Sequence, residues 1–473
     1  MKYKDTILAG IFVNILMKLI CFILLQLNVF SSGINKHIQS FRSAKGQEGI
    51  QVSVSIRSLN SGEQVYAHAS EINLPPASTL KLVTTATALE YLGPTYKFET
   101  MIYSNGRVSS GKILGDLLIE GIGDPSLGSN RFKNNPFEQV LQSLKDNEIQ
   151  TIEGQIRVLN NDTARFPLGW LVGDIGNYYG AFASPFNFHE NLYTVYFNGG
   201  TKIGEPAGIA SIKPFDPAWK IKNHVTTGPA GSGDQVNILN LPFSNEILMI
   251  GSVPLNAKNF AIKGAIPNVN KIFTDSLSSY LRQNGISVNN KIYPENLQNE
   301  ELGSILSPDV FEISKETNFR SVNIFADGLA NFMWDAEAPD YDTFLKDFWK
   351  EKGVDLSTHR FIDGSGLSPM NTLSTQNLSL ILFKMKDQNR FLQTIPIAGK
   401  EGTVSSVAVN TGGKISMKSG SISGCRNYAG YFTSNLGKKY AFSIFVNGFH
   451  SDHSKAVRTF LEEFFVKMIA IKE

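Results

Sequence analysis

Cysteine is scarce in this chain: its 473 residues include two, Cys21 and Cys425. Cys21 lies in an apolar N-terminal segment, so the rest of the chain carries a single thiol. One thiol excludes an internal disulfide, and the fold must be held by its cores alone. No histidine lies near Cys425 in the sequence, which favours a packed small side chain over a reactive thiol.

The chain also has no marked excess of either charge. It carries 44 Lys and Arg residues against 42 Asp and Glu, and without residues 1–33 the two counts are equal at 41. A nucleic-acid-binding protein usually shows a basic excess or a basic stripe. The balance predicts no nucleic-acid partner.

Signals of several enzyme classes are missing too. No Gly-x-Ser-x-Gly segment is present, which argues against the nucleophile elbow of a Ser-His-Asp hydrolase. We interpret His450 and His453 as loop residues rather than a base or a metal pair, and we predict no metal and no cofactor. There is no internal repeat, and the length indicates a globular protein of two or three domains.

Residues 1–33 stand apart from the rest. A basic start precedes an apolar stretch from Ile7 to Phe30, and Ser31-Ser32-Gly33 offers small residues for cleavage. This order is typical of a signal peptide, while a retained membrane anchor is the alternative, weakened by Lys18. Both interpretations predict an exported protein of the periplasm or cell envelope, tethered to the membrane if the segment is kept.

Alternating apolar residues predict a strand hairpin near the start, and a second pair of strands with a closing helix at the end. Between residues 97 and 270 the texture changes to short strands with frequent glycine and proline, which indicates an inserted β-rich region. Helical periodicity returns after it. The predicted strands are 51–56, 63–68, 427–432 and 440–446, and the predicted helices are 272–283, 318–334, 341–351 and 454–468.

Ser78 and Lys81 form the most informative local pattern. A helical run follows them and is stopped by Gly93-Pro94, so Ser78 is expected in the first turn of a helix. Residues at i and i+3 share a helical face, which brings the lysine amine to the serine hydroxyl, and the free N–H groups of a first turn favour negative charge. A second Ser-x-x-Lys at Ser109 lies in a glycine turn without a helix to present it.

Two further triplets follow in order. Ser321-Val322-Asn323 opens a helical stretch, and Lys418-Ser419-Gly420 opens a strand-like run that continues through Ser421. Ser-x-x-Lys, Ser-Asp-Asn and Lys-Thr-Gly are the signature set of penicillin-binding proteins and class A β-lactamases. A second Ser-x-Asn, at residues 287–289, lies in a polar turn.

On these triplets the chain resembles the class C low-molecular-mass penicillin-binding proteins of the D-alanyl-D-alanine carboxypeptidase/endopeptidase type. About 240 residues separate Lys81 from Ser321, which matches the long insertion of that family. Four further segments resemble family segments in family order: 121–127, 169–181, 363–368 and 399–403. The resemblance implies an α+β transpeptidase domain, an antiparallel sheet flanked by helices, formed by residues 34–96 and 271–473. Residues 97–270 would be the insertion, with two subdomains.

The resemblance also implies roles for the site residues. Ser78 would attack the D-Ala-D-Ala carbonyl with Lys81 as its base, and the N–H groups of Ser78 and Ser421 would bind the oxyanion. Ser321 would pass a proton to the leaving amine, and Asn323 would hold the substrate amide. The substrate carboxylate would be bound by the Lys-Ser-Gly triplet, through Lys418 and Ser419, beside Gly420. A neutral Lys81 would require burial and the nearby charge of Lys418 to lower its pKa.

The expected substrates are peptidoglycan stem peptides, with β-lactam antibiotics as slowly released inhibitors. Two departures from the family pattern stand out: Val322 replaces the usual aspartate, and Ser419 replaces threonine while keeping the hydroxyl. A β-lactamase is an alternative, although no Glu-x-x-Leu-Asn segment of the class A kind is present. An esterase or aminopeptidase on the same scaffold, or a non-catalytic wall-binding protein, are the others.

Overall fold

The computed structural model describes residues 33–159, 166–294, 299–334 and 338–471. The predicted signal peptide or anchor, residues 1–33, lies outside these ranges except for Gly33. Within the described residues, no helix combines the length and the apolar character needed to cross a bilayer.

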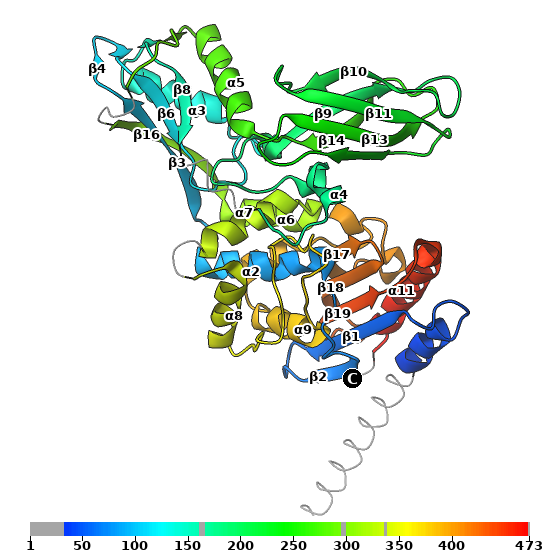
Figure 1. The fold of residues 1–473 in the computed structure, drawn as a ribbon. Helices are drawn as coiled ribbons and strands as arrows, with labels where there is room; N and C mark the ends of the chain where they lie inside the picture. The colour runs from blue at the N-terminus through cyan, green and yellow to red at the C-terminus, as the bar shows by residue number, and fades with distance from the viewer. Residues whose placement is uncertain (1–32, 160–165, 295–298, 335–337, 472–473) are drawn as a thin grey trace, which may run out of the picture.

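A five-stranded antiparallel sheet in the order β17-β18-β19-β1-β2 joins the two ends of the chain (Figure 1). β1 near the N-terminus pairs with β19 near the C-terminus, with Val54 opposite Ile444. This confirms the hairpin and the two late strands that the sequence predicts. The strands are β1 (Gln51–Ser58), β2 (Gln64–His68), β17 (Ile415–Ile422), β18 (Cys425–Thr433) and β19 (Lys439–Asn447).

Helices cover both faces of this sheet. On one face, helix 33–42 and α11 (Ser454–Ile469) build a core with the inward side chains of the strands, such as Val54 and Phe442. On the other face lies a second core around α2 (Lys81–Tyr91). The antiparallel sheet between helical layers confirms the predicted fold class. The other helices of this half are α6 (Val310–Arg320), α7 (Asn323–Trp334), α8 (Tyr341–Glu351), α9 (Thr375–Lys384) and α10 (Asn389–Gln393).

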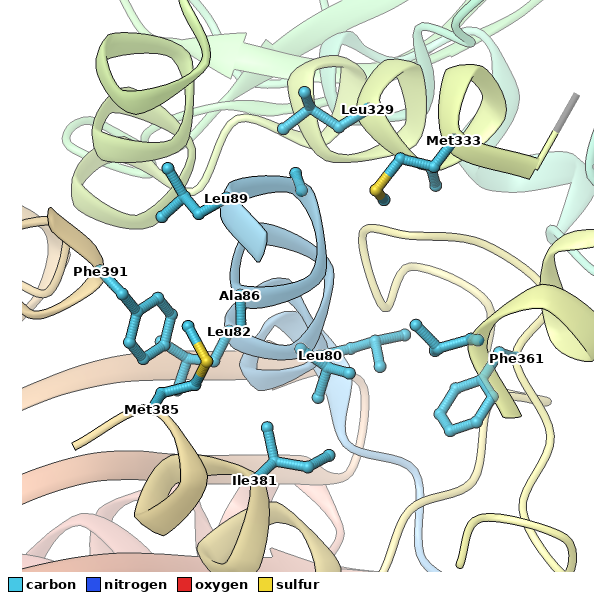
Figure 2. Packing of buried hydrophobic residues seen from close by; sticks show 14 of the residues in the cluster. Leu80, Leu82, Ala86, Leu89, Leu329, Met333, Phe361, Ile381, Met385 and Phe391 are labelled. Atoms are coloured by element: carbon cyan, nitrogen blue, oxygen red, sulfur yellow. The ribbon is translucent and has the colours of Figure 1, made fainter. Parts of the chain in front are cut away.

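Helix α2 is the central element of the second core. Its residues from Lys81 to Leu89 are all buried, so it has no polar face, as expected of a helix enclosed by protein. Figure 2 shows Leu329 and Met333 of α7 packed above it, and Ile381 of α9 below. A helix held on all sides gives a rigid support for the residues at its N-terminus.

The single helix predicted at 318–334 is wrong, because the chain breaks between α6 and α7. Ser321 caps α6 in the left-handed region, with φ 59° and ψ 40°. That conformation ends an α-helix, and it is unusual for a residue other than glycine. The break separates Ser321 from both helices and turns it toward the cleft described below.

The inserted region forms two lobes above the catalytic half (Figure 1). One lobe has the mixed sheet β16-β3-β6-β8, and the other has the sheets β10-β9-β14 and β11-β13-β12. The elements of the first are β3 (Lys97–Asn105), β6 (Asp116–Glu120), α3 (Pro136–Asp146), β8 (Ile156–Leu159), α5 (Val269–Gln283) and β16 (Asn299–Asp309). Those of the second are β9 (Leu192–Asn198), β10 (Gly208–Lys213), β11 (Lys220–Gly228), β12 (Gln235–Leu239), β13 (Glu246–Pro254) and β14 (Phe260–Ala265).

Side-chain packing bears on where the insertion ends. One hydrophobic core includes residues from Ile102 to Ile305, and with them α5 and β16. β16 also pairs with β3, the first strand of the insertion. The domain boundary at residue 270 remains a prediction, and on this packing we propose a later one, near Asp309.

Candidate active site

Ser78 and Lys81 come together through a 3-10 turn rather than an α-turn. Residues Ala77–Leu80 form the 3-10 helix, and α2 begins at Lys81. In a 3-10 turn the side chains at i and i+3 eclipse, which places the two groups face to face. The Lys81 Nζ lies 2.9 Å from the Ser78 Oγ. The pairing expected from the spacing is present, with a tighter local geometry.

Lys81 is fully buried and holds three partners. Besides Ser78, its Nζ donates to Asn323 Oδ1 at 2.6 Å and to the Ser365 carbonyl at 2.7 Å. Burial lowers the pKa of Lys81 to about 8, while the buried carboxyl groups of Asp327 and Asp363 act in the opposite direction. The sequence analysis named two causes for this shift; burial is the one that acts, and the charge of Lys81 instead depresses the pKa of Lys418.

Ser321 and Lys418 form a second serine-lysine pair. The Lys418 Nζ lies 2.9 Å from Ser321 Oγ and donates to the Ser419 carbonyl at 2.7 Å. Lys418 is completely buried, and burial holds its pKa well below the usual range, with Lys81 adding to the effect. Its amine is therefore committed inside the protein, beside Ser321.

Asn323 links the catalytic half to the insertion. It is the first residue of α7, and its Nδ2 donates to the Tyr179 carbonyl at 2.7 Å while its Oδ1 faces Lys81. Both ends of the amide are therefore occupied. Tyr179 is a residue for which the sequence predicts no site role, and it reaches the site from the inserted region.

Strand β17 runs directly beside the Ser78 turn. The Lys418 triplet lies in the interior of the strand rather than at its start. A Cβ on Gly420 would stand 2.8 Å from the Pro76 carbonyl oxygen and 3.0 Å from the Ser78 nitrogen. Only glycine allows this approach, which puts the strand backbone within reach of the Ser78 N–H. Ser419 Oγ lies 2.9 Å from Thr403 Oγ1, and Ser421 is exposed at the edge.

A buried carboxylate loop supports Lys81 from below. Asp363 accepts from the N–H groups of Gly366 and Ser368, each at 2.7 Å, and from Trp170 Nε1 at 2.8 Å. Asp327 accepts from the Ser365 N–H at 2.8 Å, and the carbonyl of Ser365 in turn accepts from Lys81. The sequence analysis assigned no role to these residues, although their segment, Asp-Gly-Ser-Gly-Leu-Ser, was among those resembling the family.

The alternative motif copies lie elsewhere. Ser109 and Lys112 stand on the short strands β4 (Val108–Ser109) and β5 (Lys112–Ile113), and Ser287 on β15 (Ser287–Val288). These strands share one small sheet of the insertion. Cys425 is buried, and burial raises the pKa of its thiol to about 11, as expected of a packed side chain.

The three triplets line one cleft of about 860 Å³. Ser78, Ser321 and Asn323 lie on one side with Ser421 and Thr403, and Tyr178 and Asp174 contribute from the insertion. In the described part of the chain, no group of three or more His, Cys, Asp or Glu side chains could hold a metal ion. The fold, with this cleft at the edge of its sheet, defines a protein of the penicillin-binding, β-lactamase-like class.

Comparison with known proteins narrows the class to a family. The family model of the D-Ala-D-Ala carboxypeptidase 3 (S13) family matches residues 34–467, and the chain belongs to that family. The resemblance drawn from the triplets is thereby confirmed, together with the enzyme class: a serine-type D-Ala-D-Ala carboxypeptidase.

Individual relatives agree with this assignment. The D-alanyl-D-alanine carboxypeptidase DacB of Haemophilus influenzae is 26% identical over 443 residues, which cover 88% of this chain and 90% of the relative. The D-alanyl-D-alanine carboxypeptidase of an Actinomadura species is 26% identical over 436 residues, 85% of this chain and 78% of the relative. The crystal structure of penicillin-binding protein 4 from H. influenzae matches with a TM-score of 0.77 and 22% identity, covering 91% of this chain and 99% of that one.

Proposed function

We propose that Ser78 is the acylated nucleophile of this carboxypeptidase, with Lys81 as its base. The observation that carries the proposal is the buried Lys81 amine 2.9 Å from the Ser78 hydroxyl, with its pKa lowered to about 8 by burial. An amine of that pKa is neutral in a useful fraction near neutral pH and accepts the hydroxyl proton as the serine attacks. The N–H groups of Ser78 and Ser421 bind the developing oxyanion.

Ser321 delivers the proton to the leaving amine in this proposal. Lys418, 2.9 Å away and buried, orients and tunes that hydroxyl. Asn323 positions Lys81 through its Oδ1, and the substrate amide contacts the site on the same side. The hydroxyls of Ser419 and Thr403 bind the substrate carboxylate. Val322 is 8% exposed and packs in the core, which agrees with a middle position that takes no part in the reaction.

The substrates we propose are peptidoglycan stem peptides ending in D-Ala-D-Ala, and β-lactams as slowly released acylating inhibitors. A crystal structure of H. influenzae penicillin-binding protein 4 in complex with a β-lactam has the same fold, with a TM-score of 0.71 and 23% identity. A wall substrate requires a location outside the cytoplasm. We therefore propose that residues 1–33 export the protein to the periplasm or cell envelope.

Cleavage of peptide cross-links is a second candidate activity at the same site. A Bdellovibrio bacteriovorus protein described as a predatory peptidoglycan endopeptidase shares the fold with a TM-score of 0.50 and 16% identity. The supporting observation in this chain is the size of the cleft, about 860 Å³, to which the insertion contributes. Such a volume admits more than a single terminal residue on either side of the scissile bond.

Release of D-alanine from an N-acylated peptide ending in D-Ala-D-Ala tests the proposal. The purified wild-type protein is expected to release D-alanine at a steady rate, and Ser78→Ala is expected to reduce it to background. Ser109→Ala is the matched control, because Ser109 belongs to the other Ser-x-x-Lys and lies on β4. Wild-type turnover by a folded Ser78→Ala protein would refute the assignment of the nucleophile.

A further inference from the structure

A second cavity of about 300 Å³ adjoins the active-site cleft at strand β17. Thr403 and Ser421 line both cavities, so the second begins where the cleft ends. Ser419 lines it as well, and Arg426 of β18 and Arg458 of α11 complete its wall. None of the sequence motifs accounts for these two arginines.

Strand register puts Arg426 on the same face of the sheet as the serine hydroxyls. Ser419 pairs with Tyr428, and Ser421 pairs with Arg426. Directly opposed residues of antiparallel strands share a face, and so do residues two apart along a strand. The Tyr428 ring packs against Phe465 of α11, with centroids 5.3 Å apart, which identifies this face as the one toward α11. All four β17 and β18 side chains therefore point toward the second cavity.

The cavity carries net positive charge. Its one acidic side chain, Glu462, is occupied: both of its oxygens accept from the Ala408 N–H, at 3.0 and 2.9 Å. Neither arginine forms an ion pair within 4.0 Å in the described part of the chain, and the Arg426 Nε is buried without a hydrogen-bond partner there. A guanidinium with unused donors beside two hydroxyls suits a carboxylate, which it can bind in a bidentate fashion.

The position of Lys418 leaves a need for such a group. Its amine is buried and engaged by Ser321 and by the Ser419 carbonyl, so it does not face the carboxylate subsite. The hydroxyls of Ser419 and Thr403 are neutral, and a carboxylate brought out of water requires a partner of opposite charge. We propose that Arg426, assisted by Arg458, binds the carboxylate of the substrate's terminal residue, between the cleft and the second cavity. The inference rests on the proposed function and names the group that recognises the substrate's charged end.

Paired substrates with and without that charge test the inference. We would measure kcat/KM for an N-acylated peptide ending in D-Ala-D-Ala as the free acid and as the C-terminal amide, and the rate of acylation by a penicillin and by its methyl ester. Arg426→Gln is expected to lower the acid-over-neutral ratio by about tenfold to a hundredfold, through a higher KM for the acid. Rates with the neutral compounds should stay near wild type, and Arg426→Lys should restore part of the preference.

Lys455→Gln is the matched control, because Lys455 is exposed on α11 and lies outside the cavity lining. Its ratio should equal that of the wild type. Should Arg426→Gln fail to fold, Arg458→Gln at an exposed position of the same helix takes its place, with a several-fold drop expected. A wild-type ratio in the folded Arg426→Gln protein, or in Arg458→Gln where that replaces it, overturns the inference. A wild-type protein that neither releases D-alanine nor forms a penicillin adduct overturns the proposed function instead.

Discussion

The Nζ of Lys81 lies 2.9 Å from the Oγ of Ser78, although the lysine side chain has no exposed surface. A lysine amine is ordinarily charged and therefore cannot accept a proton. Burial changes this, because the low-dielectric surroundings disfavour the ammonium form. The short distance and the buried amine together turn an ordinary serine into a candidate nucleophile.

Acylation should consequently depend on pH with a midpoint near the pKa of Lys81, about 8. As the pH falls through that value the amine becomes protonated and loses its ability to accept the Ser78 proton. We expect the rate of acylation by a fluorescent penicillin to fall about tenfold per pH unit well below the midpoint and to level off above it. Labelling rates between pH 6 and 9.5, with thermal unfolding at each pH, measure this. A rate that rises as the pH falls would contradict the role of Lys81.

Gly420→Ala should damage the oxyanion site by sterics alone. The new methyl group would stand 2.8 Å from the Pro76 carbonyl oxygen and 3.0 Å from the Ser78 nitrogen, and both belong to backbone that cannot swing aside. β17 must move away from the Ser78 turn, and loss of one oxyanion donor costs about a hundredfold in rate. The rate of penicillin labelling measures the effect.

Gly208→Ala provides the comparison for that substitution. Gly208 lies on β10 in the insertion, where an added Cβ meets nothing within 4 Å. Its labelling rate should match that of the wild type. Equal rates for the two alanine variants would mean that β17 does not supply an oxyanion donor.

Ser321→Ala should slow turnover without unfolding the protein. The serine is part-buried and its hydroxyl faces Lys418 at 2.9 Å, so its removal deletes the proposed proton donor to the leaving amine. General acid catalysis of this kind contributes about a hundredfold to ten-thousandfold. Steady-state release of D-alanine measures it, and Ser287→Ala, in the other Ser-x-Asn, should retain full activity. Undiminished kcat in Ser321→Ala would exclude the proton transfer we assign to it.

Asp363→Asn should destabilise the loop beneath Lys81. The carboxylate accepts from Gly366, Ser368 and Trp170, and an amide would turn one NH₂ group toward these donors. We expect a loss of about 2–4 kcal/mol in the free energy of unfolding, measured by urea denaturation, because a buried network is broken. Asp275→Asn removes a carboxylate that is 65% exposed and should change stability by less than about 0.5 kcal/mol. A loss no larger for Asp363 than for Asp275 would show that the loop does not depend on its carboxylate.

Much of the fold could be predicted because its signals are local. Alternation in β1 and β19 and the spacing of Ser78 and Lys81 depend on residues a few positions apart. The left-handed break at Ser321 could not be predicted, because neither glycine nor proline marks it and the conformation is imposed by packing. The bond between Trp170 and Asp363 joins residues 193 positions apart, across the insertion, and no periodicity indicates it.

The most direct test of the account is to locate the acylated residue. The purified protein is incubated with a fluorescent penicillin, digested, and analysed by peptide mass spectrometry, with Ser78→Ala and Ser109→Ala alongside. The account predicts one stable adduct on Ser78 in the wild type and in Ser109→Ala, and none in Ser78→Ala. An adduct on another residue, or no adduct in a folded wild-type protein, would contradict it.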